Sequence, residues 1–311
     1  MFFAVALATI VLLIYLLNQH KHSYWKKRGL VQLNPKFLVG DIGGLLKGKV
    51  SFGEFFESFY VKYKQHKAIG VYMSYQPSIV ALDPILVQNV MIRDFRNFTD
   101  RPSPFNYEND PLAAHLFHLP GQKWRDLRVK LSPTFTSGKL RNMFPTIRSC
   151  GHVLDEYLVK NMKEGVDVFE FRELMARFNT NIISSVAFGI ENDCINEPDH
   201  IFRRMGTKNM EINWRSNLTI FMAFFVPFLF QYIPFKAIDP EVEDFIFTIV
   251  RQTIDHREKN NIERNDFMQL LIQLKNQGYI SVDKGETIEG DLKKLSFNDV
   301  AAQVFVFFIA S

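Results

Sequence analysis

The chain has 311 residues, of which 47% are hydrophobic and 23% are charged, so its composition excludes a disordered protein and its length allows one large domain or two. Lysine and arginine number 37 against 33 acidic residues, and this excess of four charges gives no support for nucleic-acid binding. Phenylalanine occurs 31 times, which suits a protein that lines apolar cavities or touches lipid as well as filling a core.

An apolar run opens the chain, from Met1 to Leu17, and Thr9 is its only clearly polar side chain. As a helix it would be roughly 25 Å long, just enough to cross a bilayer. Basic residues follow it, at Lys21 and at 26–28, and none precedes it, so the positive-inside rule places the N-terminus outside and the rest in the cytosol. A cleaved signal peptide is the alternative, but it normally has a basic segment first and small residues at its end. We expect residues 1–20 to be an uncleaved membrane anchor.

The segment after the anchor is basic and rich in glycine, and it is predicted to be a mobile linker over residues 21–50. An amphipathic helix is predicted to begin near Ser51, with Phe55 and Phe59 on one side. The next pattern is a β-hairpin, with strands over 71–75 and 78–82 on either side of Gln76-Pro77.

Further helices are predicted from their capping residues. Asp83 caps a helix that has Pro84 at its first position and runs to about Arg93. Residues 97–120 form a long polar connection, which is a candidate functional loop. Later helices are predicted to start at Asp239, at Asp266 and at Ser296, where Asp299 completes a capping box.

Two segments are unusually apolar. Leu218–Ile238 could be a second membrane span, but Pro227 and Pro234 would each break the backbone ladder of a membrane helix. We interpret it as an apolar loop that dips into the membrane surface or edges an apolar channel, with ordinary core packing as the alternative. The helix over Val300–Ala310 is apolar on nearly every side, which is typical of a helix at the centre of a protein, and the chain ends within it as though cut short.

The two cysteines, Cys150 and Cys194, are too few for a disulfide framework or a zinc cluster, and they favour a reducing, cytosol-facing compartment. Each is interpreted as a small buried hydrophobe rather than a reagent.

The segment Gly121–Leu131 carries the strongest chemical pattern. On a helix, Trp124 and Arg128 share one face with Leu127 and Leu131, which predicts a guanidinium buried in an apolar stripe beside an indole. Burying that charge alone would cost several kcal/mol, so it calls for an anionic partner. An exposed cation–π pair is the alternative interpretation.

The string Leu131-Ser132-Pro133-Thr134-Phe135-Thr136-Ser137-Gly138-Lys139-Leu140, placed directly after this Trp-x-x-x-Arg pattern, resembles the third-helix region of microsomal cytochrome P450 enzymes. The resemblance is strongest to the insect detoxification group often called family 6. Matches in the same order cover the whole chain: Tyr24–Gly29, Asp94-Phe95, Asp100-Arg101, Asp110–Leu112, His115–Phe117, Phe188–Ile190, Arg264–Leu271 and Ala301–Ala310.

The resemblance implies the cytochrome P450 fold, which is mainly α with a small β-sheet region and is preceded by a transmembrane helix. It implies that this fold is incomplete at its C-terminus here, with residues 51–311 as the N-terminal part of the enzyme domain. It implies haem b as the cofactor, with Trp124 and Arg128 on one propionate and Arg101 as a second propionate-binding arginine. It implies a substrate cavity lined by Phe105, Phe117, Phe305, Phe308 and Ala310, for which core packing is the alternative. It also implies a reductase-docking surface, or merely a solvated basic face, at Lys123, Arg125, Lys130, Lys139 and Arg141.

The chain departs from the family's pattern in ways that matter for catalysis. The proximal thiolate of the family lies in a Phe-x-x-Gly-x-Arg-x-Cys-x-Gly loop, and neither Cys150 nor Cys194 has such surroundings. The Glu-x-x-Arg pair in the family's context is missing, and the oxygen-activating acid and threonine would follow Ala310, with Ser311 where the family usually has Gly. Without an axial thiolate, O–O cleavage has no electron push.

Three hypotheses follow. In the first, the chain is the N-terminal part of an endoplasmic-reticulum monooxygenase that oxidises lipophilic small molecules. Its electrons would come from NADPH through cytochrome P450 reductase, with cytochrome b5 as a second candidate partner. The 311 residues alone would then be inactive. In the second, the chain itself is a catalytically inert, membrane-anchored binder that competes for reductase or captures hydrophobic ligands. In the third, it comes from a truncated gene without a folded product.

Overall fold

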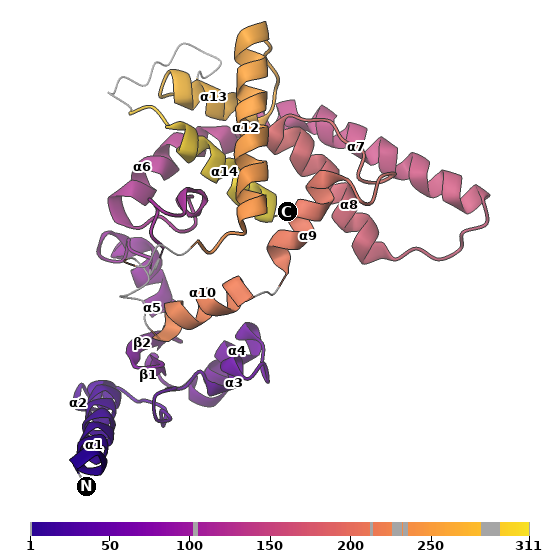
Figure 1. Ribbon diagram of the computed structural model, residues 1–311. Coiled ribbons are helices and arrows are strands. Elements are labelled where there is room, and N and C mark those ends of the chain that lie inside the picture. Colours follow the sequence, from indigo (N-terminus) through magenta and orange to yellow (C-terminus); the bar gives the residue numbers. More distant parts are fainter. Residues whose placement is uncertain are drawn as a thin grey trace. The chain divides into compact units, whose positions relative to one another are not determined.

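The computed structural model describes residues 2–101, 105–211, 214–225, 232, 236–280 and 293–310 (Figure 1). These residues form two compact units. The first, called unit 1 below, comprises Met1–Thr99 with Phe221–Pro227, and the second, unit 2, comprises Asp100–Ile220 with Phe228–Ser311. Most of the described chain is helical and the strands form a single two-stranded sheet, so the predicted mainly α fold with a small β region is confirmed.

Unit 1 begins with one long apolar helix, α1, over Phe2–His22. It is the one described helix that is long and apolar enough to cross a membrane, and its large apolar side chains are exposed. The other regular elements of this unit are α2 (Tyr24–Lys27), α3 (Gly43–Leu46), α4 (Phe52–Tyr63), β1 (Ala68–Met73), β2 (Gln76–Ala81) and α5 (Pro84–Gln88), which continues as a π-helical turn over Asn89–Arg93 and a 3-10 turn over Phe95–Asn97.

Local capping explains where these helices start. Ser51 accepts a hydrogen bond from the Glu54 backbone N–H and Glu54 accepts one from the Ser51 N–H, which closes a capping box at the start of α4. The Asp83 carboxylate accepts from the N–H groups of Ile85 and Leu86, as the predicted cap of α5 requires. Both predicted helix starts are therefore confirmed.

The hairpin is present, but its predicted turn is wrong by two residues. Gln76 and Pro77 belong to β2, where Pro77 pairs with Tyr72, and the chain turns instead at Ser74-Tyr75. Ser74 adopts the left-handed conformation, with φ of 60°, which a tight turn between antiparallel strands needs. Proline is tolerated in β2 because each strand of a two-stranded sheet is an edge strand.

Residues 21–50 fold against this hairpin where the sequence predicted a mobile linker. Gln32 forms a parallel bridge with Gly70, and Gly40 forms an antiparallel bridge with Met73. The indole of Trp25 lies so close to Gly70 that a Cβ on Gly70 would be 2.3 Å from it. The segment is therefore part of the ordered packing of unit 1.

Unit 2 is a helical assembly around α14 (Phe297–Ile309), which contacts α9, α12, α13 and a 3-10 turn over Pro111–Ala113. Its residues from Val300 to Phe305 are all buried, so the predicted central position of this apolar helix is confirmed. The remaining described α-helices of unit 2 are α6 (Gly121–Leu131), α7 (Ser137–Lys163), α8 (Phe171–Ile183), α9 (Ile201–Met210), α12 (Pro240–Asn260) and α13 (Phe267–Asn276). A 3-10 turn over Ser132–Phe135 follows α6, and a π-helical turn over Ser184–Phe188 follows α8. The residues of α10 (Trp214–Phe225) are divided between the two units.

Three caps in unit 2 agree with the sequence. The Asp239 carboxylate accepts from the Glu241 N–H at the start of α12, Asp266 accepts from the Gln269 N–H at the start of α13, and Ser296 closes a capping box with Asp299. The interpretation of the apolar segment 218–238 falls largely outside the described residues, because Pro227, Pro234 and most of their neighbours are not described.

Candidate functional site

Helix α6 presents the Trp-x-x-x-Arg pattern, and its apolar side is set by two leucines. Leu127 and Leu131 are buried in the core of unit 2, and Trp124, one turn before, is half-buried against the same core. Gly121 begins the helix with a positive φ of 51°, and a Cβ there would lie 2.8 Å from the Asp100 carboxylate. The indole is thus held by packing against the core of unit 2.

Arg128 differs from its predicted state. Its side chain is exposed, and within the described ranges it has no hydrogen-bond or ion-pair partner. The prediction of a buried guanidinium is therefore wrong for this structure. The prediction required an anionic partner for the buried charge. Without an adjacent anion, a guanidinium is more stable in water than in an apolar stripe.

Arg101 and Trp124 are brought together from opposite ends of the long connection. The Arg101 guanidinium donates to the Phe117 carbonyl oxygen at 3.1 Å and lies 5.9 Å from the centre of the Trp124 ring and 5.5 Å from that of Phe117. The structure therefore places one predicted propionate-binding arginine against the indole of α6. Arg101 itself remains exposed, so its charge is accessible to an anion from solvent.

A stack of rings joins the long connection to α14. Phe105 stacks on His118 with ring centres 4.4 Å apart, His118 lies 4.2 Å from His115, and His115 lies 6.3 Å from Phe305 on α14. His115 is almost completely buried, and burial lowers its pKa to about 3. Burial also lowers the pKa of His118, to about 4. The Phe117 N–H donates to His115 Nδ1, so the proton of the neutral ring is on Nε2.

These two histidines are the functional candidates that the sequence reasoning missed. The His115 Nε2 and His118 Nδ1 atoms are buried and have no hydrogen-bond partner among the described residues. The signal available in the sequence was their spacing of three residues inside a loop already marked as functional. These two neutral imidazoles lie beside Phe305 and Phe105, and the unpaired nitrogen of each ring can form a hydrogen bond with a polar group that enters there.

Gln303 holds the loop against the central helix. Its side chain is fully buried on α14, its Oε1 accepts from the Leu116 N–H at 3.0 Å, and its Nε2 donates to the Ala114 carbonyl at 3.5 Å. An amide in an otherwise apolar helix is satisfied by loop backbone groups that would otherwise be unpaired. It therefore fixes the distance between the loop and α14.

The residues predicted for a substrate cavity do not all lie together. Phe105 and Phe305 belong to the ring stack, and the exposed Phe117 lies beside His118 with ring centres 5.5 Å apart. Phe308 packs instead on Phe188 and Phe202 in the core. Ala310 is exposed at the end of α14.

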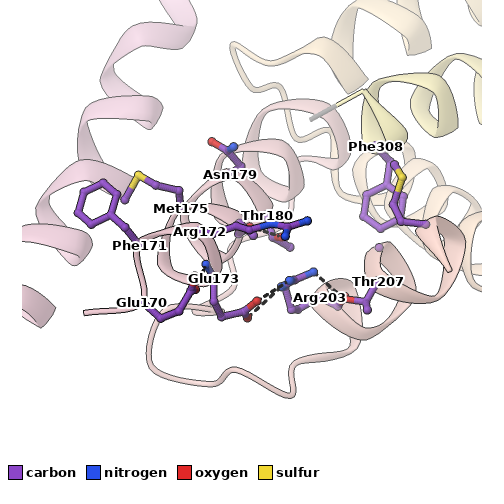
Figure 2. Close-up of a pocket in the computed structure, with 13 residues that line it drawn as sticks. Glu170, Phe171, Arg172, Glu173, Met175, Asn179, Thr180, Arg203, Thr207 and Phe308 are labelled. Atoms are coloured by element: carbon purple, nitrogen blue, oxygen red, sulfur yellow. Dashed lines mark hydrogen bonds and ion pairs between the residues drawn. The ribbon is translucent and has the colours of Figure 1, made fainter. Parts of the chain in front are cut away.

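Phe308 also borders a cavity of about 850 Å³ between α8 and α9, shown in Figure 2. The lining of this cavity includes an ion pair in which Arg203 Nη2 lies 2.7 Å from Glu173 Oε2, and Arg203 also donates to the Thr207 hydroxyl. The cavity shares Phe308 with the predicted substrate site and none of the other four residues. We therefore do not assign it to the substrate site.

The residues predicted to dock the reductase differ in how far their side chains are exposed. Lys123, Arg125 and Arg141 are exposed, whereas Lys130 and Lys139 are half-buried. The Lys130 ammonium donates to the Lys293 carbonyl oxygen, so it is partly occupied within the protein.

Neither cysteine has the surroundings of a metal-binding thiolate. Cys194 is fully buried and burial raises the pKa of its thiol to about 11, while burial also raises the pKa of the half-buried Cys150. Burial therefore makes the thiolate, the form that acts as a nucleophile or ligand, less accessible at both positions.

Unit 2 has a central apolar helix, and in it Arg101 lies near the indole of Trp124 on α6. The chain also has an N-terminal helix that is long and apolar enough to cross a membrane. These features define a class of mainly helical proteins with a candidate anion site. The sequence model of the family described as Cytochrome P450 matches residues 33–311. The chain belongs to the cytochrome P450 family.

Curated relatives support the same assignment. The chain is 37% identical over 309 residues to cytochrome P450 6A1 of Musca domestica, an alignment that covers 99% of the chain and 59% of the relative. It is 39% identical over 307 residues to cytochrome P450 6a2 of Drosophila melanogaster, covering 96% of the chain and 59% of the relative. The resemblance to insect family 6 proteins is thus confirmed, and the chain spans about 59% of the length of these relatives.

Proposed function

We propose that the protein carrying this chain is a haem-thiolate monooxygenase, which oxidises lipophilic small molecules with O2 and electrons from NADPH delivered by cytochrome P450 reductase. The observation that carries this proposal is the placement of Arg101 against Trp124, with Arg128 one turn further along α6 and exposed, in a chain of the cytochrome P450 family.

The residues present fit the propionate side of haem b. An anion that meets Arg128 finds a guanidinium with no competing partner among the described residues, and Arg101 adds a second charge beside the half-buried indole. The donor geometry of arginine suits a carboxylate, which can accept two parallel N–H bonds. Arg128, Arg101 and Trp124 would therefore hold and orient the propionates.

The residues present do not supply the axial ligand. Cys194 is fully buried, burial raises the pKa of both thiols, and neither cysteine lies in the family's Phe-x-x-Gly-x-Arg-x-Cys-x-Gly pattern, so we propose that the ligating thiolate lies in residues outside this sequence. When bound, the haem with its thiolate supplies the activation of O2 for insertion of one oxygen atom into the substrate. We propose that the 311 residues without that ligand are inactive as an oxygenase.

The ring stack of Phe105, His118, His115 and Phe305 would form part of the substrate wall. Its aromatic faces favour an apolar substrate, while the two unsatisfied imidazole nitrogens can hydrogen-bond to one polar group of that substrate. Phe117 can contribute through its exposed ring. We give Phe308 and Ala310 a smaller part, because one is packed in the core and the other lies at the exposed end of α14.

Electron delivery would use the basic side chains of α6 and α7. Lys123, Arg125 and Arg141 are exposed and can steer an acidic reductase or cytochrome b5 by long-range attraction, which salt weakens. Lys130 and Lys139 are less exposed and would contribute less. The helix α1 would anchor the protein in the endoplasmic-reticulum membrane, with its N-terminus lumenal and the body cytosolic.

The haem assignment is tested by expressing the full-length protein and measuring its carbon-monoxide difference spectrum and haem content. We expect a thiolate-type band, and we expect Arg128→Ala to lower the haem retained after dialysis. Arg125→Ala, which removes an exposed arginine from the same helix, serves as the matched control and should keep its haem. A full-length protein that gives no thiolate-type band would overturn the proposal.

A further inference from the structure

The hydrogen bonds of the His115 ring determine which of its nitrogens carries the proton. The Phe117 N–H donates to Nδ1 at 3.3 Å, so Nδ1 acts as an acceptor. The ring is neutral near pH 7, because burial lowers its pKa to about 3. The one proton of the neutral ring is therefore on Nε2, and this buried N–H group has no hydrogen-bond partner among the described residues.

His118 presents the opposite kind of group. Its ring is also neutral, because burial lowers its pKa to about 4, and a hydrogen bond from the ring to the Ala113 carbonyl oxygen opposes this shift only in part. Since Nδ1 is the nitrogen without a partner, the donor to Ala113 is Nε2. The Nδ1 atom of His118 is therefore a buried acceptor with an unused lone pair.

The loop thus holds an unpaired donor beside an unpaired acceptor, on rings whose centres are 4.2 Å apart. A metal ion would need a lone pair from each ring, and the one lone pair of neutral His115 is engaged by the Phe117 N–H. A carboxylate only accepts and an ammonium only donates, so each would leave one nitrogen unpaired. A hydroxyl group both donates and accepts, and it can satisfy both nitrogens.

The rings around the pair favour an apolar molecule as the carrier of that hydroxyl. Phe105 stacks on His118 at 4.4 Å between ring centres, Phe117 lies 5.5 Å from His118, and Phe305 lies 6.3 Å from His115. A charged ligand would lose its hydration against these rings, whereas an apolar skeleton would gain contact area. A few placed polar groups in an apolar wall are typical of small-molecule sites.

The loop backbone around the pair is held in place by side chains from within and outside the loop. Gln303 on α14 accepts from the Leu116 N–H at 3.0 Å and donates to the Ala114 carbonyl at 3.5 Å. The Tyr107 hydroxyl donates to the His118 carbonyl at 2.9 Å. The two imidazoles are therefore positioned before a ligand arrives, which lowers the entropic cost of binding.

We propose that His115 and His118 form a subsite for the hydroxyl group of a lipophilic alcohol or phenol. The His115 Nε2–H donates to the hydroxyl oxygen, and the His118 Nδ1 accepts a hydrogen bond from the hydroxyl. The subsite rests on the proposed function, and it narrows the substrate class to apolar molecules that already carry a hydroxyl. An analogue of the same size without the hydroxyl leaves both nitrogens unpaired and binds more weakly.

The test measures the binding of three probes to the full-length protein by equilibrium dialysis. The probes are naphthol, methylnaphthalene and methoxynaphthalene, substituted at the same carbon, so that the hydroxyl is compared with a methyl group and with an ether that accepts but cannot donate. His118→Phe keeps an aromatic ring in the stack and removes the acceptor. His152→Phe, at an exposed position on α7, is the matched control. Circular dichroism and the carbon-monoxide difference spectrum verify that each variant is folded.

We expect the parent protein to bind naphthol about tenfold or more tightly than either analogue. His118→Phe should reduce this preference to about twofold or less, and His152→Phe should keep it in full.

The parent protein alone can refute the subsite. Equal affinities for naphthol and methylnaphthalene, or binding of neither, in a protein that gives the thiolate-type band would overturn the subsite and leave the proposed function intact; the two nitrogens would then serve a buried water at most. A folded His118→Phe variant that keeps the preference would overturn the subsite as well. A full-length protein without the thiolate-type band would overturn the proposed function, and the subsite with it.

Discussion

Two arginines of unit 2 have opposite surroundings. Arg257 on α12 is 4% exposed and meets the equally buried Asp266 through two bonds, of 2.9 and 2.5 Å, with Gln269 accepting a third. Arg128 on α6 is exposed and has no partner among the described residues. The difference teaches that an apolar helix face does not by itself bury a guanidinium. A carboxylate placed within reach does, and for Arg128 we propose that the carboxylate belongs to the haem.

The largest expected effect comes from breaking the buried pair. Arg257→Ala removes the buried charge partner of the Asp266 carboxylate and leaves it only the more exposed Arg264, whose Nε atom lies 3.3 Å from Asp266 Oδ2. We expect a loss of about 3 kcal/mol in the free energy of unfolding, at the lower end of the range for breaking a buried pair. Urea unfolding in detergent micelles, followed by circular dichroism, measures it. The matched control is Arg251→Ala on the same helix, which removes a cation over the Phe297 ring at 4.5 Å and should cost about 1 kcal/mol or less. Equal losses in the two variants would contradict the comparison.

The second effect comes from crowding the same pair. Gly189 has a φ of 70°, and a Cβ there would lie 1.8 Å from the Arg257 Nη2 atom. We expect Gly189→Ala to destabilise the chain by about 2 kcal/mol, through backbone strain and displacement of the guanidinium. Gly151→Ala on α7 is the control, since its Cβ meets nothing within 4 Å, and it should stabilise by about 0.5–1 kcal/mol. A Gly189→Ala chain that is at least as stable as the parent would show that Gly189 has no such constraint.

Many elements of the fold could be predicted from the sequence alone, because they depend on neighbouring residues. The caps at Asp83, Asp239, Asp266 and Ser296 follow from side chains that bond their own backbone within three residues, and all were predicted. The central helix α14 was predicted because its apolar character needs no knowledge of its neighbours.

Three of the four failures depend on groups that are distant in sequence, and the fourth, the misplaced hairpin turn, is a local error of register. Periodicity placed Arg128 on an apolar face but could not show whether an anion was within reach, and the turn at Ser74 depends on a register that pairs Tyr72 with Pro77. The folding of residues 21–50 against the hairpin depends on the close fit of Trp25 over Gly70, which no local pattern encodes. The His115–His118 pair is placed at the candidate site by the contact of His115 with Phe305, which is nearly two hundred residues away in the sequence.

The third effect depends on pH and concerns that histidine pair. The pKa of His115 is lowered to about 3 and that of His118 to about 4 in the folded chain, against 6.5 when unfolded. Below pH 6.5 the unfolded chain therefore binds protons that the folded chain does not, so stability falls as the pH drops from 6.5 toward 4.

Urea unfolding at several pH values measures this loss. We expect His115→Asn, whose side-chain oxygen can accept from the Phe117 N–H in place of Nδ1, to lose less stability between pH 6.5 and 4 than the parent chain. His152→Asn, an exposed position on α7, should follow the parent curve. A parent chain whose stability is flat across this range would contradict the burial of the two imidazoles.

The smallest effect on stability is expected at Arg128, and it tests whether this arginine has a partner within the protein. Arg128→Ala removes an exposed side chain that makes no hydrogen bond or ion pair with a described residue, so the free energy of unfolding of this chain should change by about 0.5 kcal/mol or less. The same substitution should lower haem retention in the full-length protein. A stability loss comparable to that of Arg257→Ala would mean that Arg128 already has a protein partner and is not reserved for a ligand. An unchanged stability together with a lost cofactor would instead separate the two arginines by what each one binds: Arg257 a carboxylate of the protein, Arg128 a carboxylate that the protein must acquire.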